Sequence, residues 1–174
     1  MTGKGPAWSL DIQEKLFPIM REQERLLENA LRLARFAEII GLPVVVTEQK
    51  KLGPTLPQIM ELLPGTHPIE KTSFDAFRCE LFRERIESLG PRTIVLAGIE
   101  AHICVTQTAL HALPDLRVHV ISDAVASRLP GNRRVGLDRM AAAGATISST
   151  EMFIFELLME AGTDTFRKVL EIIK

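Results

Sequence analysis

Hydrophobic and polar positions along the chain follow two periods, one typical of amphipathic helices and one typical of buried strands. Between residues 20 and 40, apolar side chains recur at steps of three and four residues, and charged side chains fill the opposite face. The apolar positions are Leu26, Ala30, Leu33, Ala34, Ala37 and Ile40, and the charged ones are Arg21, Glu24, Arg25, Glu28 and Arg32. This pattern predicts a helix over 20–40 that packs one side on a sheet.

A succession of helix, turn and strand occurs at three junctions of the chain. The junctions are "IIGLPVVVT" (39–47), "ESLGPRTIVLAG" (87–98) and "MAAAGATISST" (140–150). In each junction a helical pattern ends at a glycine, and a run rich in β-branched residues follows. Glycine readily adopts the left-handed conformation that ends a helix, while Val, Ile and Thr favour strands. The chain is therefore expected to alternate helices and strands.

The complete pattern predicts an α/β fold. Strands are expected at 7–10, 44–47, 67–71, 93–98, 118–122 and 146–149, and helices near 20–40, 57–63, 75–89, 103–112, 132–143, 151–161 and 163–174. Because a crossover helix returns the chain to the same end of the sheet, this alternation implies parallel strands with right-handed connections. We therefore predict one domain over residues 1–174, with three α/β/α layers and a mostly parallel sheet. The first strand, "AWSLD", is shorter and more polar than a central parallel strand usually is.

Composition and charge fit one folded domain without a charged binding surface. The 174 residues are 46% hydrophobic, and 21 basic and 22 acidic residues are mixed along the chain, which gives a net charge of −1. Because no block of one sign occurs, the sequence does not indicate binding to nucleic acid. We expect a small neutral or polar molecule as the partner.

The sequence also predicts a cytoplasmic protein with free thiols. The stretch "MTGKGPAWSLDIQEK" lacks the apolar core of a signal peptide, and no run approaches the roughly 20 apolar residues that span a bilayer. Only two cysteines occur, Cys79 and Cys104, and neither has a second cysteine nearby for a zinc site. We therefore expect no membrane association and no disulfide.

Four residues with reactive side chains fall near the predicted carboxyl ends of strands, where open parallel sheets bind ligands. They are Asp11, Lys71, Cys104 and Asp123. Cys104 lies where a helix begins, and unpaired N–H groups and the helix dipole at that point favour a thiolate nucleophile. The alternative is a small buried residue, because free cysteines are often buried. We assign Asp123 to a loop before a helix, as a turn or cap residue outside the chemistry.

Asp11 and Lys71 each have an ordinary structural explanation, a helix cap for the aspartate and a solvated surface position for the lysine. Whether they meet Cys104 depends on the strand order. In the order 3-2-1-4-5-6, the first and fourth strands are neighbours about 4.8 Å apart, which brings Asp11 and Cys104 within reach of each other. Lys71 then lies about two strand spacings from Asp11, a gap that its long side chain can largely cross.

Other nucleophile or base candidates are less well placed. His102 is two residues from Cys104, an unfavourable spacing for facing side chains on a helix, and His119 falls in the middle of a strand. Cys79 lies inside a helical pattern, where its neighbours indicate packing or surface exposure.

Together, these motifs resemble a known family. The segments "SLDIQEKLFPIM", "VVVTEQKKLGPTLPQI", "AGIEAHICVTQTALHAL" and "VHVISDAVASR" are similar to those of the isochorismatase-like cysteine hydrolases, in the branch of isochorismatase domain-containing proteins. The resemblance implies a doubly wound sheet of order 3-2-1-4-5-6 and a catalytic set of Asp11, Lys71 and Cys104. It also implies a cis peptide between Ile99 and Glu100, and an oxyanion hole formed by the backbone N–H groups of Glu100 and Cys104.

The resemblance further implies acyl transfer, in which a Cys thioester forms as an amide or related C–N bond of a small molecule is cleaved. Nicotinamidases of this superfamily carry an Asp-x-His metal site after the second strand, whereas this chain has "TEQKK" there, so no metal and no cofactor are expected. Two alternatives stay open. One is a hydrolase of isochorismate or another small acid, and the other is a catalytically silent interaction protein with the same fold.

The sequence also leads to expectations about the loops around the site and about oligomerisation. We predict that the substrate contacts Gln13, Phe17, Gln49 and Phe74 on loops near the site, and that the proline-rich stretch 52–68 forms a wall or lid over the pocket. The resemblance implies a homo-oligomer, a dimer or a tetramer. The apolar segment "MFIFELLMEAG" is expected to contribute core or interface contacts.

Overall fold

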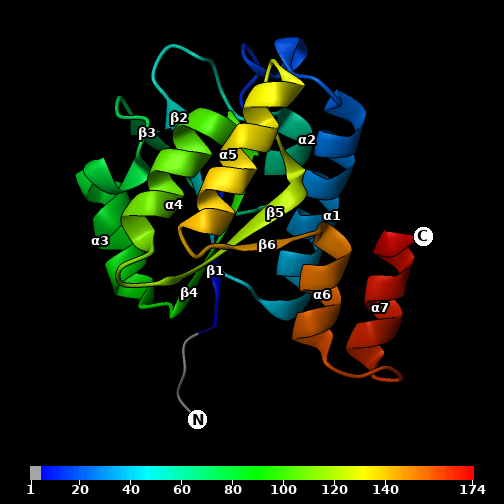
Figure 1. The fold of residues 1–174 in the computed structure, drawn as a ribbon. Helices are drawn as coiled ribbons and strands as arrows, with labels where there is room; N and C mark the ends of the chain where they lie inside the picture. Colours follow the sequence, from blue (N-terminus) through cyan, green and yellow to red (C-terminus); the bar gives the residue numbers. More distant parts are fainter. Residues whose placement is uncertain (1–4) are drawn as a thin grey trace.

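A computed structural model describes residues 5–174, and a six-stranded parallel sheet runs through its centre (Figure 1). The strands are β1 (Ala7–Asp11), β2 (Val44–Gln49), β3 (Ile69–Lys71), β4 (Thr93–Ile99), β5 (Arg117–Ala126) and β6 (Thr146–Ser148). Their order across the sheet is β3-β2-β1-β4-β5-β6, and each pair of neighbours is parallel. The predicted doubly wound α/β fold and its strand order are therefore confirmed.

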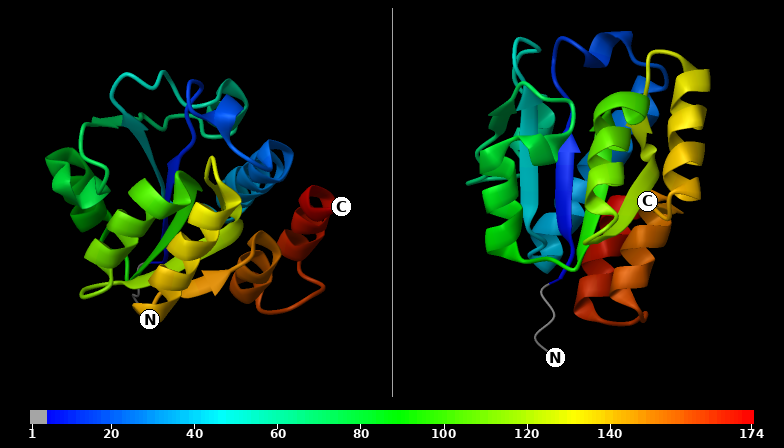
Figure 2. Two further views of the ribbon diagram at one scale, coloured as in Figure 1. Left: turned by 45° about the horizontal axis from the view of Figure 1, so that its top comes forward. Right: turned by 60° about the vertical axis from the view of Figure 1, so that its left-hand side comes forward.

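Helices cover both faces of the sheet (Figure 2). One layer contains α1 (Gln23–Ile40), α6 (Thr150–Leu158) and α7 (Asp164–Ile173), and the other contains α3 (Glu80–Leu89), α4 (Thr106–Ala112) and α5 (Pro130–Ala142). The shorter elements are α2 (Pro57–Met60), the 3-10 turns η1 (Phe17–Ile19) and η2 (Ala76–Arg78), and the π-helical turn η3 (Ala101–Val105). Between residues 5 and 174, no helix combines the length and the apolar character needed to span a bilayer.

The hydrophobic pattern of α1 explains its position. Five of its six predicted apolar residues are buried in one core cluster with side chains of the sheet, while Ile40 is partly exposed at the end of the helix. The helix ends at Gly41, whose φ of 66° is a conformation that residues with a side chain adopt at a cost. A second core cluster lies on the opposite face, beneath α3, α4 and α5. The two clusters are the two interfaces of a three-layer domain.

The short strand β1 occupies the centre of the sheet. Trp8 pairs with Val44 of β2 and with Val95 of β4, so the backbone of β1 is hydrogen-bonded on both sides. Ala7 and Trp8 are almost completely buried. Five residues are therefore sufficient for this strand, because both neighbouring ladders stabilise it.

The predicted loop position of Asp123 was wrong, although its carboxylate does bind the start of a helix. β5 continues to Ala126 and does not end at residue 122, so Asp123 lies within a strand. Its Oδ1 accepts hydrogen bonds from the backbone N–H and the hydroxyl of Thr150, both at 2.8 Å. Asp123 therefore pairs one of the backbone N–H groups that lack a partner at the start of α6, 27 residues later in the chain. Local sequence patterns do not contain such a contact between distant elements.

The start of the 52–68 stretch is bonded to the loop after β1 and forms a wall beside the sheet. Backbone hydrogen bonds join Leu56 N–H to Ile12 C=O at 3.1 Å and Glu14 N–H to Pro54 C=O at 2.9 Å. Gln13 and Thr55 add an isolated antiparallel bridge. These bonds connect the loop after β1 with the loop after β2, at the edge where the reactive side chains lie.

Candidate active site

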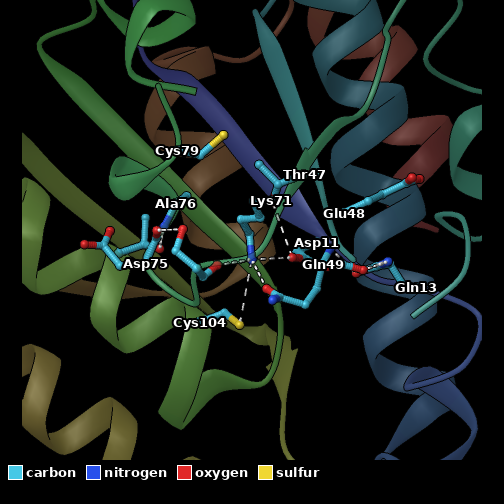
Figure 3. Close-up of polar contacts among 12 residues, drawn as sticks. Asp11, Gln13, Thr47, Glu48, Gln49, Lys71, Asp75, Ala76, Cys79 and Cys104 are labelled. Carbon is cyan, nitrogen blue, oxygen red and sulfur yellow. Dashed lines mark hydrogen bonds and ion pairs between the residues drawn. The ribbon is translucent and has the colours of Figure 1, made fainter. Parts of the chain in front are cut away.

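Three side chains from distant parts of the sequence meet at the carboxyl edge of the sheet (Figure 3). Asp11 is the last residue of β1, Lys71 is the last residue of β3, and Cys104 lies in η3 directly after β4. The Lys71 Nζ lies 3.3 Å from Asp11 Oδ2 and 4.0 Å from Cys104 Sγ. One ammonium group therefore contacts both the carboxylate and the sulfur.

The ammonium of Lys71 is surrounded by acceptors. Its Nζ donates to Gln49 Oε1 at 2.8 Å and to the Ser73 carbonyl at 3.3 Å, in addition to its contacts with Asp11 and Cys104. Only 3% of Lys71 is exposed, and a buried ammonium requires partners of this kind. The ordinary explanation of Lys71, a solvated surface position, therefore does not apply, and its long side chain reaches inward to Asp11 and Cys104.

Gly98 allows Asp11 to lie so close to β4. The two residues pair across the sheet, and Gly98 has a φ of 121°. A Cβ atom added to Gly98 would lie 2.8 Å from Asp11 N and 3.0 Å from Asp11 C, which is too close for a real contact. The sequence pattern alone does not single out this glycine, because a close approach between two strands appears only in the fold.

Cys104 lies in a π-helical turn and not in the first turn of a regular helix. The carbonyl of Glu100 accepts from the backbone N–H groups of Ile103 and Val105, at 3.1 and 3.3 Å. The backbone N–H of Glu100 donates to the Cys104 sulfur, and the peptide bond between Ile99 and Glu100 is cis. The backbone around residue 100 therefore faces the sulfur.

The side chain of Glu100 fastens this turn to the next loop. Glu100 is 4% exposed, and its carboxylate accepts from the backbone N–H of Arg128 at 3.0 Å and from Arg128 Nε at 3.1 Å. A charge-assisted contact of this kind holds both residues in a defined orientation. The turn that carries Cys104 is thus connected to the loop that follows β5.

Burial sets the protonation states of the site. It raises the pKa of Asp11 from its ordinary value to about 6, although the Lys71 ammonium and the Thr47 hydroxyl act in the opposite direction. Burial also raises the pKa of the Cys104 thiol, and Lys71 and the N–H of Glu100 lower it only in part. Desolvation is thus a larger effect on the Cys104 thiol than the N–H groups that favour a thiolate. At neutral pH the resting pair is a carboxylate and a thiol.

A small cavity of about 20 Å³ lies among these side chains. It is lined by Ser9, Asp11, Thr47, Lys71, Ala76, Leu96, Ala97, Cys104, Val105 and Thr108. A volume of this size accommodates one water molecule or a group of similar size. The space beside the sulfur is therefore limited to a small reacting group.

The four predicted substrate-contacting residues have different surroundings. Gln13 is 1% exposed, and its side-chain amide is hydrogen-bonded to backbone groups of Gln49 and Gly53. The Gln49 amide contacts Lys71 and the Thr72 carbonyl, and Phe17 packs against a core cluster. Phe74 is 52% exposed on the loop after β3, so of the four it has the side chain most open to a ligand.

A buried network that the sequence analysis did not identify holds the segment after Lys71. Asp75 Oδ1 accepts from the Phe77 N–H at 3.0 Å, and Asp75 Oδ2 lies 2.7 Å from His111 Nδ1 of α4. The Ala76 N–H donates to Thr108 Oγ1 at 3.0 Å. These contacts tie one wall of the cavity to α4. Residues 5–174 contain no group of three or more His, Cys, Asp or Glu side chains arranged to hold a metal ion.

The fold and this cluster define a doubly wound α/β protein with an Asp, Lys and Cys site, and comparisons with known proteins identify its family. A family model described as "Isochorismatase domain" matches residues 9–152, and the chain belongs to this isochorismatase family. Isochorismatase domain-containing protein 2 of Danio rerio is 34% identical over 91% of this chain and 81% of that protein. Isochorismatase domain-containing protein 1 of the same species is 35% identical over 94% of this chain, which spans only 59% of that protein.

Solved structures show the same relationship. The structure described as MAR1 ribonuclease from Caenorhabditis elegans is similar with a TM-score of 0.91 and 31% identity, covering 99% of this chain and 91% of that one. YcaC from Pseudomonas aeruginosa, whose structure contains hexane-2,5-diol and covalent acrylamide, has a TM-score of 0.90 and 25% identity, covering 97% and 89%. YcaC from Escherichia coli, described as an octameric hydrolase of unknown specificity, has the same fold at 24% identity, with a TM-score of 0.92 over 98% of this chain and 87% of that one.

Proposed function

We propose that the protein is a metal-independent cysteine hydrolase that cleaves an amide or related C–N bond in a small molecule. The observation that carries this proposal is the contact of one buried ammonium, that of Lys71, with both the Asp11 carboxylate and the Cys104 sulfur. A nucleophile and a base that share a third, orienting group fit the arrangement used in covalent catalysis. Membership of the isochorismatase family supports a hydrolytic reaction.

The proposed reaction has two stages. Asp11 accepts the thiol proton as Cys104 attacks the carbonyl carbon, and the backbone N–H groups of Glu100 and Cys104 stabilise the oxyanion. Asp11 then gives the proton to the leaving amine, and a thioester on Cys104 results. Water activated by Asp11 cleaves this thioester, which releases a carboxylic acid and regenerates the thiol. The two products are the acid and ammonia or an amine.

The raised pKa of Asp11 suits this role. A carboxyl group whose pKa is about 6 is a stronger base than an ordinary aspartate, and it is still ionised at neutral pH. The proximity of Lys71 keeps the pKa from rising further, because the ammonium favours the ionised carboxylate. The positive charge of Lys71 also lowers the pKa of the Cys104 thiol, which offsets part of the increase caused by desolvation.

We predict that the rate of Cys104 alkylation by iodoacetamide rises with a midpoint near pH 6. At low pH both Asp11 and Cys104 are protonated. The reactive state, a Cys104 thiolate with a protonated Asp11, has one proton fewer, so its population rises as the pair loses its first proton, which is set by the ionisation of Asp11. In the variant Asp11→Asn this step is expected to disappear, and the rate at pH 7 is expected to fall about tenfold or more. Peptide mass spectrometry measures Cys104 and Cys79 in the same sample, and Cys79 serves as an internal reference thiol. A single step at high pH in the unmodified protein would contradict the assigned base.

The substrate class is tested by trapping the acyl-enzyme. Small carboxamides, carbamoyl compounds, isochorismate and RNA form the panel, and RNA is included because the C. elegans relative is described as a ribonuclease. Intact-mass spectrometry after rapid acid quenching detects a thioester as an added acyl mass on Cys104. Adducts with amides or carbamoyl compounds support the proposal, whereas cleavage of isochorismate or RNA without any adduct would replace it.

We also propose a homo-oligomer, a dimer or a tetramer, in the cytoplasm. On α6, Phe153 and Ile154 are buried, but Met152 and Phe155, three residues apart on one side of the helix, are 54% and 37% exposed. Met159, directly after the helix, is 88% exposed. Exposed apolar side chains grouped in this way are typical of protein interfaces. Static light scattering should give a multiple of the 19.4 kDa chain mass, and a clean monomer would reject the assembly. The free thiols of Cys79 and Cys104 fit the proposed location.

A further inference from the structure

The side-chain amide of Gln13 hydrogen-bonds to the backbone of Gln49, as the backbone of a neighbouring strand would. The register between β1 and β2 ends with Leu10 and Val46, and Gln49 lies three residues further along β2. There, Gln13 Oε1 accepts from the Gln49 N–H at 2.7 Å, and Gln13 Nε2 donates to the Gln49 carbonyl at 3.0 Å and to the Gly53 carbonyl at 2.6 Å. Both backbone groups of Gln49 are therefore held by one buried side chain.

The side chain of Gln49 is in turn fixed in one orientation. Its Nε2 donates to the Thr72 carbonyl at 2.6 Å, and its Oε1 accepts from Lys71 Nζ at 2.8 Å, which is the shortest contact of that ammonium (Figure 3). Rotation of the amide by half a turn would place an NH₂ group against the ammonium and lose both hydrogen bonds. The carbonyl oxygen of Gln49 is thus directed at Lys71.

We propose that Gln49, held in place by Gln13, is a positioning residue that keeps the Lys71 ammonium in contact with both the Asp11 carboxylate and the Cys104 sulfur. This inference rests on the proposed function, in which that ammonium supports both the base and the nucleophile. It assigns Gln13 and Gln49 to the catalytic geometry, and not to contact with the substrate. The third and fourth contacts of the ammonium, with Ser73 and Cys104, are at 3.3 and 4.0 Å.

The neutrality of the amide is part of this role. Gln49 accepts a hydrogen bond from the ammonium without adding negative charge, so the positive charge of Lys71 still acts on Asp11 and on Cys104. A carboxylate at the same place would compensate that charge and repel the ionised Asp11. Asp11 would then ionise at a higher pH. The positioning role of Gln49 therefore affects the pH dependence of Cys104 alkylation as well as its rate.

The test compares two glutamine-to-glutamate variants by the pH dependence of Cys104 alkylation. Gln49→Glu is expected to move the midpoint near pH 6 upward by about one unit. Gln58→Glu introduces the same charge at an exposed position of α2 and is expected to leave the midpoint unchanged. Gln49→Met keeps the length of the side chain but removes the acceptor, and it is expected to slow Cys104 alkylation at pH 7 about tenfold.

The outcomes separate this inference from the proposed function. If the unmodified protein has its midpoint near pH 6 and Gln49→Glu leaves it there, the positioning role is rejected while the proposed base is retained. If the unmodified protein shows no such step, the proposed function itself fails. Alkylation of Cys79 and the melting temperature are followed in every variant. A folded Gln49→Met protein that alkylates Cys104 at the unmodified rate would also overturn the role of Gln49.

Discussion

The variant Cys104→Ala is expected to fold normally and to lose at least about 10⁴-fold in kcat on any substrate found in the panel. The thiol is the only group in the proposed reaction that forms a covalent bond with the acyl carbon. Without it, the proposed oxyanion donors, the N–H groups of Glu100 and residue 104, can still bind a substrate, but no thioester can form. Because Cys104 is only partly buried and alanine is smaller, the change in stability is expected to be about 1 kcal/mol or less.

The matched control is Cys79→Ala. Cys79 precedes α3, and its sulfur lies 3.8 Å from the Glu70 carbonyl, outside the set of groups around Lys71. This variant is expected to retain full activity. The double variant of Cys104→Ala with Asp11→Asn should be no less active than Cys104→Ala alone, because residues that act in one step are not additive. Turnover by Cys104→Ala within tenfold of the unmodified protein would remove the covalent mechanism.

The variant Gly98→Ala is expected to be the most damaging single-methyl substitution near the site. The added Cβ would lie 2.8 Å from Asp11 N, and the contacting atoms belong to a central strand that cannot move without breaking its ladders. Overpacking of this kind costs roughly 1–3 kcal/mol, and the φ of 121° adds strain for any residue with a side chain. A total loss of about 3 kcal/mol should lower the melting temperature by roughly 10 °C.

Gly131→Ala is the control for this substitution. Gly131 lies in the first turn of α5, its φ is outside the left-handed region, and no atom among the described residues outside its own helical turn approaches an added Cβ within 4 Å. This change is expected to be neutral or to stabilise the protein slightly, since alanine favours helices. Differential scanning calorimetry of both variants gives the comparison. Equal melting temperatures would show that β1 and β4 separate more easily than the structure indicates.

Much of the candidate site could be predicted from the sequence, because ligand sites of parallel sheets lie at the carboxyl ends of the strands. Asp11 and Lys71 could be selected because each ends a predicted strand, and Cys104 because it follows one. Parallel strands bring such positions to one edge of the sheet, whatever their separation along the chain. The positions at strand ends do not predict the protonation states of Asp11 and Cys104. Burial raises the pKa of the Cys104 thiol, and burial depends on the packing of helices that the local pattern around residue 104 does not describe.

The supporting residues could not have been chosen from the sequence in the same way. The Gln13 amide pairs with the backbone of Gln49, 36 residues away, and Asp123 satisfies Thr150, 27 residues away. A glutamine or aspartate in a loop is common, and its partner is fixed only when the strands are assembled. Gly98 shows the same limit, because its lack of a side chain matters only where the backbone of β1 passes beside it.

The sequence by itself determined the alternation of helices and strands and the position of the reactive side chains at strand ends. Periodic burial and glycine helix ends are properties of short segments, so they are visible without the fold. Only the tertiary structure decided that one ammonium contacts both the Asp11 carboxylate and the Cys104 sulfur, and that the amide of Gln49, which is bonded to Gln13, also contacts it. Distances between distant segments and the desolvation of charged groups arise from packing in three dimensions, and no local pattern encodes them.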